Sequence, residues 1–205
     1  MNVWFENPAR AVSDNHRRRA FERQQQLTKP AGSLGILESC AIELAALQQR
    51  DNPAVEAVAI RIFAADHGVA EEGVSAFPQV VTGEMVKNFS AGGAAITVLA
   101  RSLGASFQVI NAGCVNPLPP LPSVDDRRIA NGTANFCKAP AMNAAQCAQA
   151  LQTGADAIDA LGSVDLFIGG EMGIANTTTA AALACALLQL APENMVGRGT
   201  GVDDN

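Results

Sequence analysis

Short runs of branched apolar residues alternate with longer helix-forming segments, and this alternation limits the possible fold more than any other feature of the chain. The runs lie at residues 55–65, 106–110 and 164–168, and each ends in glycine and polar residues. Strands that alternate with helices form parallel βαβ units. We therefore predict an α/β fold, with a doubly wound parallel sheet and flanking helices in a three-layer α/β/α arrangement.

Apolar spacing and breaker residues divide the rest of the chain. Helices are expected over residues 14–27, 33–47, 81–89, 90–103, 143–161 and 180–188. Four prolines between Pro117 and Pro122 predict a long irregular excursion over 114–141, and loops of that length in a compact domain are often functional. The pattern predicts a helical N-terminal segment over 1–50 and an α/β core over 51–205.

Composition excludes several classes of protein. A formal net charge of -6 argues against a nucleic-acid binder. The apolar runs are about half as long as a membrane helix requires, and residues 1–21 lack the apolar stretch of a signal peptide. The five cysteines contain no CxxC pair, which favours reduced, mostly buried thiols and a cytoplasmic location.

The ends of the three predicted strands all carry polar residues and glycines. They are Asp66-His67-Gly68, Asn111-Ala112-Gly113 and Gly169-Gly170-Glu171. Carboxyl ends of parallel strands meet at one edge of a sheet, where open α/β folds bind their ligands. The sequence therefore predicts a binding site at this edge.

The third strand end leads into a segment suited to anions. Glu171 and the run 176–179, with one Asn and three Thr, lie between the strand and an apolar helix. Asn and Thr side chains often cap helix N-termini, where backbone N–H groups and the helix dipole attract anions. The segment is a candidate binding site for a phosphate or a nucleotide, with one acidic residue in it. An ordinary capped turn between a strand and a helix has the same spacing.

Asp66 and His67 suit either of two interpretations. A metal site, as in a metal-dependent phosphatase, would need further ligands, and His16 is the only other histidine. We favour a loop-ordering role, with Asp66 organising the loop that follows and His67 hydrogen-bonded beside it. The glycine-rich segment 197–201 matches neither the dinucleotide-binding pattern nor the P-loop pattern, and no motif suggests a covalent nucleophile.

Four separated blocks together resemble one enzyme family. They read KPAGSLGILE (29–38), FAADHGVAEEGVSAFPQVVTGEMVKNFSAGGAAI (63–96), GEMGIANTTTAAAL (170–183) and GRGTGVDD (197–204). The resemblance is to the nicotinate-nucleotide–dimethylbenzimidazole phosphoribosyltransferases of cobalamin lower-ligand synthesis, and it runs in order along the whole chain.

The resemblance implies a reaction and an assembly. A benzimidazole ring nitrogen attacks C1′ of nicotinate mononucleotide, and nicotinate leaves with inversion to give α-ribazole 5′-phosphate. Family members are homodimers that use no metal or organic cofactor. They have a small helical domain built from both chain ends, to which residues 1–50 would contribute.

The resemblance also implies site residues. By family position, Gln79 and Lys87 line the benzimidazole pocket, although a solvated helix lysine is the alternative for Lys87; Phe77 and Met85 are candidate apolar walls. Glu171 suits a ribose hydroxyl or the azole N–H better than a phosphate. The full predicted substrate-binding set is Gln79, Lys87, Gly170, Glu171, Met172, Gly173, Ile174, Asn176, Thr177, Thr178, Gly199, Thr200, Gly201 and Asp203.

Family members are longer than this chain, and their general base, a glutamate, lies in a part that would follow Asn205. No residue of this chain is matched to that base. The resemblance therefore implies a C-terminally truncated Rossmann-like core with little activity alone, paired with a second copy or a complementing C-terminal chain. The alternative is a non-catalytic remnant that binds nucleotides or azoles.

Overall fold

The computed structural model describes residues 6–198, which form two compact units that divide between Ala57 and Val58. The sequence pattern had predicted this division at residue 50. The first unit pairs helices α1 (Asp14–Gln26) and α2 (Ile36–Gln48). Ser13 caps α1 by accepting from the His16 N–H, and the Arg17 guanidinium reaches both Glu43 oxygens at 2.9 Å.

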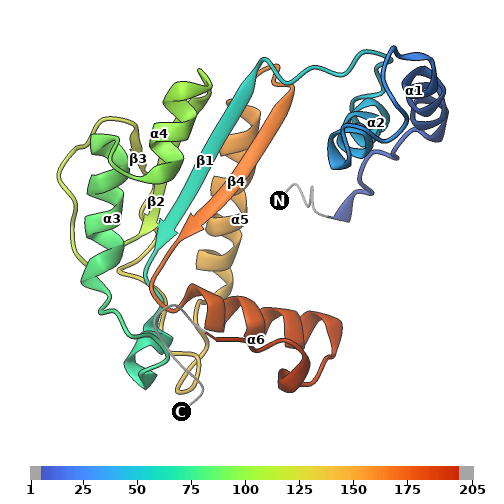
Figure 1. Cartoon of the computed structure of the whole chain (residues 1–205). Coiled ribbons are helices and arrows are strands. Elements are labelled where there is room, and N and C mark those ends of the chain that lie inside the picture. The colour runs from blue at the N-terminus through green and yellow to red at the C-terminus, as the bar shows by residue number, and fades with distance from the viewer. Residues whose placement is uncertain (1–5, 199–205) are drawn as a thin grey trace. The chain divides into compact units, whose positions relative to one another are not determined.

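The second unit is built on four parallel strands (Figure 1). They are β1 (Val58–Ala65), β2 (Ser106–Gly113), β3 (Val124–Asp126) and β4 (Leu166–Met172), in the spatial order β3-β2-β1-β4. Every neighbouring pair is parallel, because helices or long connections carry the chain back between strands. The predicted α/β fold with a parallel sheet and flanking helices is confirmed.

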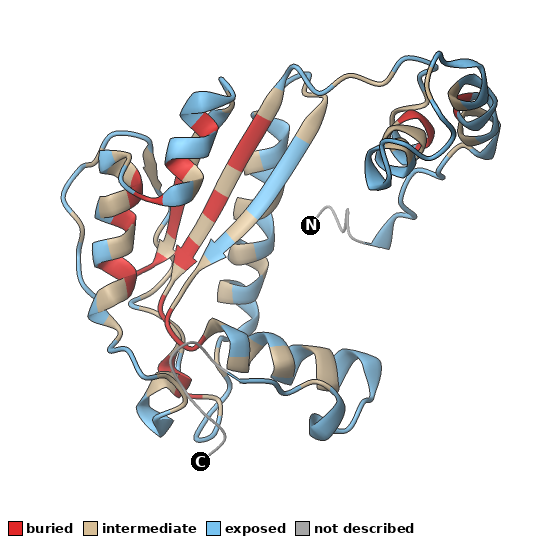
Figure 2. Cartoon of the chain, in the orientation of Figure 1, coloured by how far each residue is buried: buried red, intermediate tan, exposed pale blue. Residues whose placement is uncertain are grey.

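One face of this sheet carries the apolar core. Helices α3 (Val80–Ala91) and α4 (Ala95–Ser102) contribute Val86, Phe89 and Ala100, which pack with Ile60 and Ile62 of β1. Alternate residues of β1 are buried there, as expected for a strand whose side chains point alternately to opposite faces. Figure 2 shows the buried residues gathered on β1, β2, α3 and α4.

The remaining elements are far more exposed. Helices α5 (Ala144–Asp159) and α6 (Asn176–Leu188) contain no buried residue, and β4 is mostly exposed (Figure 2). Short 3₁₀ helices lie at Gly68–Glu72 and Pro192–Asn194. No helix within residues 6–198 is long and apolar enough to cross a membrane.

Several sequence-based boundaries were wrong, for identifiable reasons. The glycines at 169 and 170 do not end β4, because backbone pairing with β1 carries the strand on to Met172. The predicted helix over 90–103 is divided at Gly92, whose φ of 78° lies in the left-handed region and ends α3. Strand β3 lies inside the excursion that was expected to be irregular. No local pattern indicated it, because only its pairing with β2 makes it a strand.

The place of β4 in the sheet and the burial of the cysteines depend on tertiary contacts. Strand β4 lies at an edge of the four-stranded sheet that residues 6–198 form, although residues 166–168 are apolar. The cysteines were expected to be mostly buried, yet Cys40, Cys137 and Cys147 are exposed and only Cys114 is buried. Cys137 lies in the long excursion, whereas Cys40 and Cys147 lie on exposed faces of α2 and α5. The spacing of residues along a helix does not show whether another element packs against a given face.

Candidate functional site

A small hollow of about 320 Å³ lies beside the carboxyl end of β4. Phe77 and Met85 contribute apolar side chains from the α3 side, and Glu171 contributes a carboxylate from β4. The hollow is lined by Val74, Ser75, Phe77, Val81, Met85, Glu171, Met172, Gly173, Ile174, Ala175, Asn176 and Thr177. Apolar walls with one convergent acidic group suit a flat ring that carries an N–H donor.

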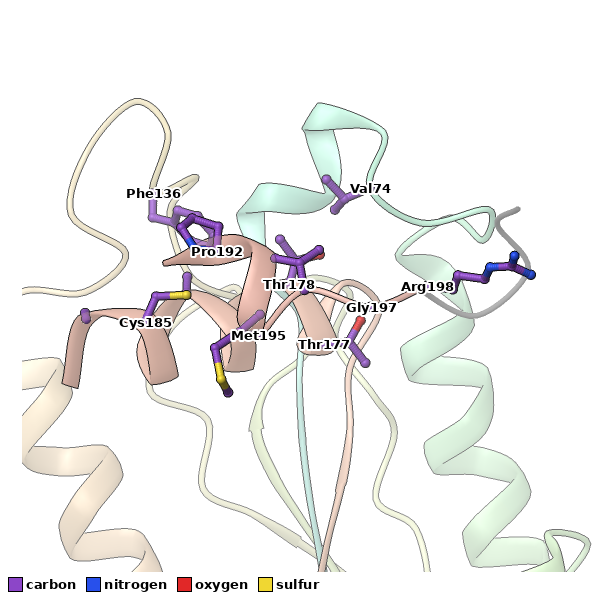
Figure 3. A pocket seen from close by; sticks show the side chains of 13 residues that line it. Val74, Phe136, Thr177, Thr178, Cys185, Pro192, Met195, Gly197 and Arg198 are labelled. Atoms are coloured by element: carbon purple, nitrogen blue, oxygen red, sulfur yellow. The ribbon is translucent and has the colours of Figure 1, made fainter. Parts of the chain in front are cut away.

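A wider groove of about 1210 Å³ follows α6 (Figure 3). Thr177 and Thr178 stand at one end of it, with Cys185, Met195 and Arg198 among the other lining residues. Val74 and Thr177 line both the groove and the small hollow. The two cavities therefore share these two residues in their walls, with a smaller cavity on the α3 side and a larger one along α6.

The first turn of α6 has an unusual cap. Ala175 is the N-cap, its φ of 71° is left-handed, and no side chain accepts a hydrogen bond from the turn. The expected capping by Asn and Thr is therefore wrong: the helix begins at Asn176, so these polar side chains lie within its first turn. A left-handed alanine costs of order 1 kcal/mol or more, and such strain is typical of functional sites. Helix N–H groups without a side-chain cap favour an anion.

His67 lies at the junction of the elements that build the site. Its Nδ1 is 3.0 Å from the Thr179 hydroxyl in α6, and its carbonyl accepts from the Gln79 amide at 2.8 Å. Burial lowers the pKa of His67 below its ordinary value, although the Asp66 charge opposes this shift. The ring is therefore predominantly neutral at pH 7, with one nitrogen donating and one accepting.

Asp66 is almost completely buried and organises the loops next to the site. Its Oδ2 accepts from the Val115 N–H at 2.8 Å, and its carbonyl accepts from Thr133 N–H at 3.0 Å. Asn111 acts similarly: its Oδ1 accepts from the N–H groups of Gly113 and Cys114. Two of the three predicted strand ends therefore carry side chains that are bonded into the loop framework.

The turn between β4 and α6 is held from two sides. Ile174 N–H donates to the buried Thr82 hydroxyl of α3 at 3.1 Å. Gly173 packs so closely that a Cβ there would lie 2.3 Å from the Ala65 carbonyl oxygen and 2.9 Å from the His67 ring. Only glycine permits this approach, which places the turn beside the end of β1.

The structure brings together many of the predicted substrate-binding residues. Met172, Gly173, Ile174, Asn176 and Thr177 line the small hollow with Glu171, while Thr178 lines the groove. The candidate walls Phe77 and Met85 line the same small hollow, and their contact with a benzimidazole ring stays a prediction. The set at Gly199, Thr200, Gly201 and Asp203 lies outside the described residues.

Three predicted residues lie elsewhere. The side-chain amide of Gln79 donates a hydrogen bond to the His67 carbonyl. Lys87 is exposed and forms an ion pair with Glu84 at 2.7 Å. Neither side chain lines the small hollow, and neither does Gly170, whose Cβ position is filled by Ile62. Contact of these three residues with substrate stays a prediction.

Sequence reasoning missed residues that contribute to the site. Val74 lines both cavities, and Thr82 and Thr179 supply hydroxyls that hold the site's framework. A buried-face threonine in an amphipathic helix was the one available signal for Thr82. Arg198 also lines the groove, although its guanidinium points away from α6 (Figure 3).

The strand ends do not form a metal centre. Across residues 6–198, no group of three or more His, Cys, Asp or Glu side chains is arranged to hold a metal ion. The carboxylate and the imidazole at the end of β1 have partners within the protein, since Asp66 holds Val115 and His67 holds Thr179. These contacts favour the loop-ordering interpretation over the phosphatase.

Comparison with known proteins agrees with this geometry. The profile of a family described as phosphoribosyltransferase matches residues 9–205. A nicotinate-nucleotide–dimethylbenzimidazole phosphoribosyltransferase from Pseudomonas aeruginosa is 55% identical over 203 residues, covering 98% of this chain and 58% of that protein. One of the same name from Xanthomonas euvesicatoria is 58% identical over 196 residues, which is 94% of this chain and 56% of the relative.

A solved structure shows the same arrangement. CobT from Thermus thermophilus superposes with a TM-score of 0.84 at 46% sequence identity, over 93% of this chain and 58% of that one. The chain thus spans somewhat more than half the length of the relatives that it matches. By sequence and by structure, the chain belongs to the nicotinate-nucleotide–dimethylbenzimidazole phosphoribosyltransferase family.

Proposed function

We propose that this chain provides the ring-binding and nucleotide-binding parts of an enzyme that transfers phosphoribose from nicotinate mononucleotide to 5,6-dimethylbenzimidazole. The observation that carries the proposal is that a small cavity and a larger one share Val74 and Thr177 in their walls. A reaction that links a flat azole to a nucleotide needs a small apolar compartment beside a larger one. The P. aeruginosa and X. euvesicatoria relatives bear the name of this reaction.

The proposed chemistry is displacement at an anomeric carbon. The azole nitrogen donates its lone pair to C1′ while the bond from C1′ to the nicotinate nitrogen breaks. The electron pair of that bond returns to the nicotinate ring, and the azole N–H proton passes to a base. The reaction passes through an oxocarbenium-like state, as glycoside chemistry does.

The residues of the site divide these tasks. The α6 first turn favours the substrate's phosphate, because it presents N–H donors and the positive end of the helix dipole beside the groove. Glu171 would accept from a ribose hydroxyl or from the azole N–H, and Phe77 and Met85 would face the azole ring. We assign the general base to a part of the family's chain that would follow Asn205.

Calorimetric titration of the 205-residue chain with each substrate tests the proposal, alongside chromatographic detection of α-ribazole 5′-phosphate. We expect both substrates to bind and turnover to be far slower than in a full-length relative. If neither substrate binds, the proposal is wrong for this chain. Turnover at a full-length relative's rate would contradict the placement of the base.

The same experiment decides between the alternatives. Binding of both substrates with no detectable product supports the non-catalytic remnant. Phosphate release that is abolished by a chelator and by His67→Ala would support the phosphatase instead. The hydrogen bonds of Asp66 and His67 to Val115 and Thr179 disfavour that last outcome.

A partner chain is part of the proposal. Leu183, Leu187 and Leu188 of α6 are all more than half exposed, and β4 exposes Phe167 and Ile168. A second copy, as in a homodimer, or a complementing C-terminal chain would cover such apolar surface. Analytical ultracentrifugation of the chain tests this, and a stable monomer at micromolar concentration would contradict it.

A cytoplasmic location completes the proposal. All five cysteines lie within the described residues and none forms a disulfide, which fits a reducing compartment. Fractionation of cells that express the chain, with an antibody against it, would test the location.

A further inference from the structure

We propose that His67 is a positioning residue that links the two compartments of the site, and this inference rests on the proposed function. Its main chain is bonded to the ring-binding side, and its side chain is bonded to the nucleotide-binding side. The imidazole therefore sets the position of the α6 first turn, although His67 is not among the residues that line either cavity.

The side-chain link runs to α6. The 3.0 Å contact between His67 Nδ1 and the Thr179 hydroxyl spans 112 positions in sequence. Thr179 N–H also donates to the carbonyl of the left-handed Ala175. The imidazole thus holds the end of a turn that has no side-chain cap of its own.

The main-chain link runs to α3. The His67 carbonyl accepts from the side-chain amide of Gln79, which directly precedes α3, the helix that carries Met85. The backbone on either side of His67 is fixed as well, since Asp66 N–H donates to Gly113 and Gly68 N–H donates to Thr133. A substitution of the His67 side chain leaves these backbone bonds available.

The two links can therefore be tested separately, because one is formed by the His67 side chain and the other by the His67 main chain. Removing the imidazole or the Thr179 hydroxyl releases the α6 first turn, whereas Phe77 and Met85 remain supported through α3. The Thr82 hydroxyl also continues to hold Ile174 independently of His67. Asn176 and Thr177 of the α6 first turn also line the small hollow, so the consequence is a loss of affinity for the nucleotide that exceeds the loss for the azole.

The test uses four single variants, one double variant and one control variant of the 205-residue chain. Thr179→Val and His67→Leu remove the bond, whereas Thr179→Ser and His67→Asn keep a group that can form it. The double variant combines His67→Leu with Thr179→Val. Thr153→Val is the matched control, because that hydroxyl bonds within its own helix, to the Gln149 carbonyl.

Calorimetry with nicotinate mononucleotide and with dimethylbenzimidazole supplies the first readout. Each removing variant should lower nucleotide affinity about fivefold to tenfold, the magnitude of one lost hydrogen bond. The nucleotide affinity of the double variant should lie within about twofold of the affinity of the single variant that binds the nucleotide less tightly. The reason is that both single substitutions and the double substitution remove the same contact. Thr179→Ser and His67→Asn should stay within about twofold of the unmodified chain, and each removing variant should lose less affinity for the azole than for the nucleotide.

Hydrogen–deuterium exchange supplies a readout that needs no substrate. The amides of residues 179–181, which donate to the carbonyls of Ala175 and of the first turn, should exchange faster in Thr179→Val than in Thr153→Val. Equal loss of affinity for both substrates, or unchanged exchange at 179–181, would overturn the positioning role. If the unmodified chain binds neither substrate, the proposed function fails, and the exchange rates still decide whether His67 positions α6.

Discussion

The two sides of the α/β unit differ sharply in how they bury apolar residues, and Ile60 and Ile168 show the difference directly. These two isoleucines are register partners in neighbouring parallel strands, so they project from the same face of the sheet. Ile60 in β1 is 2% exposed and Ile168 in β4 is 37% exposed. Helices α3 and α4 cover the first, and no element within residues 6–198 covers the second to the same extent.

The site lies on the border between the packed side and the open side. Phe77 and Met85 come from the packed side, whereas Glu171, Asn176 and Thr177 come from β4 and α6. A site assembled this way has one wall fixed by the core and one wall fixed by a few hydrogen bonds. His67 and Thr82 both form hydrogen bonds that connect the two.

The largest expected effect tests the packing difference itself. Ile60→Ala should lower the free energy of unfolding by about 2–5 kcal/mol, because it removes buried atoms from the packed core. Ile168→Ala should cost about 1 kcal/mol or less, since much of that side chain already meets solvent. Urea unfolding followed by circular dichroism measures both, and equal losses would contradict the comparison.

The second effect is a pH dependence on the packed side. Burial, reinforced by the charge of Asp66, raises the pKa of the Cys114 thiol from 9.0 to about 11, while Arg128 opposes the shift. Between these values the unfolded chain has lost this proton and the folded chain keeps it, so stability falls as pH rises. The slope contributed is at most about 1.4 kcal/mol per pH unit.

Urea unfolding at about pH 8.5 and about pH 10.5 measures this alkaline loss. Cys114→Ser should reduce the loss. Cys147→Ala, which removes an exposed thiol from α5, should leave it unchanged. An identical loss in the unmodified chain and in Cys114→Ser would show that the buried thiol is not its source.

The third effect concerns Glu171, which lies on the wall of the site formed by β4 and α6. Glu171→Gln should lower affinity for one of the two substrates by about tenfold, or about 1.4 kcal/mol, because a charged acceptor becomes a neutral one. The substrate affected shows whether Glu171 faces a ribose hydroxyl or the azole N–H. Glu84→Gln is the matched control, since Glu84 is exposed and forms an ion pair with Lys87.

Calorimetric titration measures these affinities for both variants. If Glu84→Gln weakens binding as much as Glu171→Gln does, the effect reflects overall charge rather than the site. Unchanged affinities for both substrates in Glu171→Gln would contradict the assignment of Glu171.

The smallest effect concerns a helix on the open side. Asn143 forms a reciprocal capping box with Gln146 at the start of α5, a helix with no buried residue. Asn143→Ala should destabilise the helix by about 1 kcal/mol, and its first turn should fray locally. Amide exchange at residues 144–147 measures this, with Gln152→Ala as the mid-helix control. Cooperative loss of the whole unit would contradict local fraying.

Much of the fold was predictable because its signals are local. The apolar runs and their following helices predicted β1, β2 and β4 and their parallel pairing. The edge position of β4 was not predictable in this way, because an apolar run has the same composition whether or not a neighbour covers it. The three-residue β3 was missed for the same reason, since only its pairing with β2 defines it as a strand.

The site was predictable in part. Glu171, Asn176 and Thr177 were found because they lie next to a strand end, and Phe77 and Met85 were found by position in a recognised block. Gln79 and Lys87 came from the same block, but the structure turns one toward the His67 carbonyl and the other toward Glu84. Position in a motif does not determine the direction in which a side chain points.

The sequence alone determined the α/β class and the family, because periodicity is local and the four blocks are contiguous stretches of residues. Tertiary structure decided how the site is held together. The bond from His67 to Thr179 joins residues 112 positions apart, and the left-handed Ala175 is imposed by the turn that this bond and Thr82 secure. Contacts between distant residues depend on how the elements pack, and no local pattern encodes that packing.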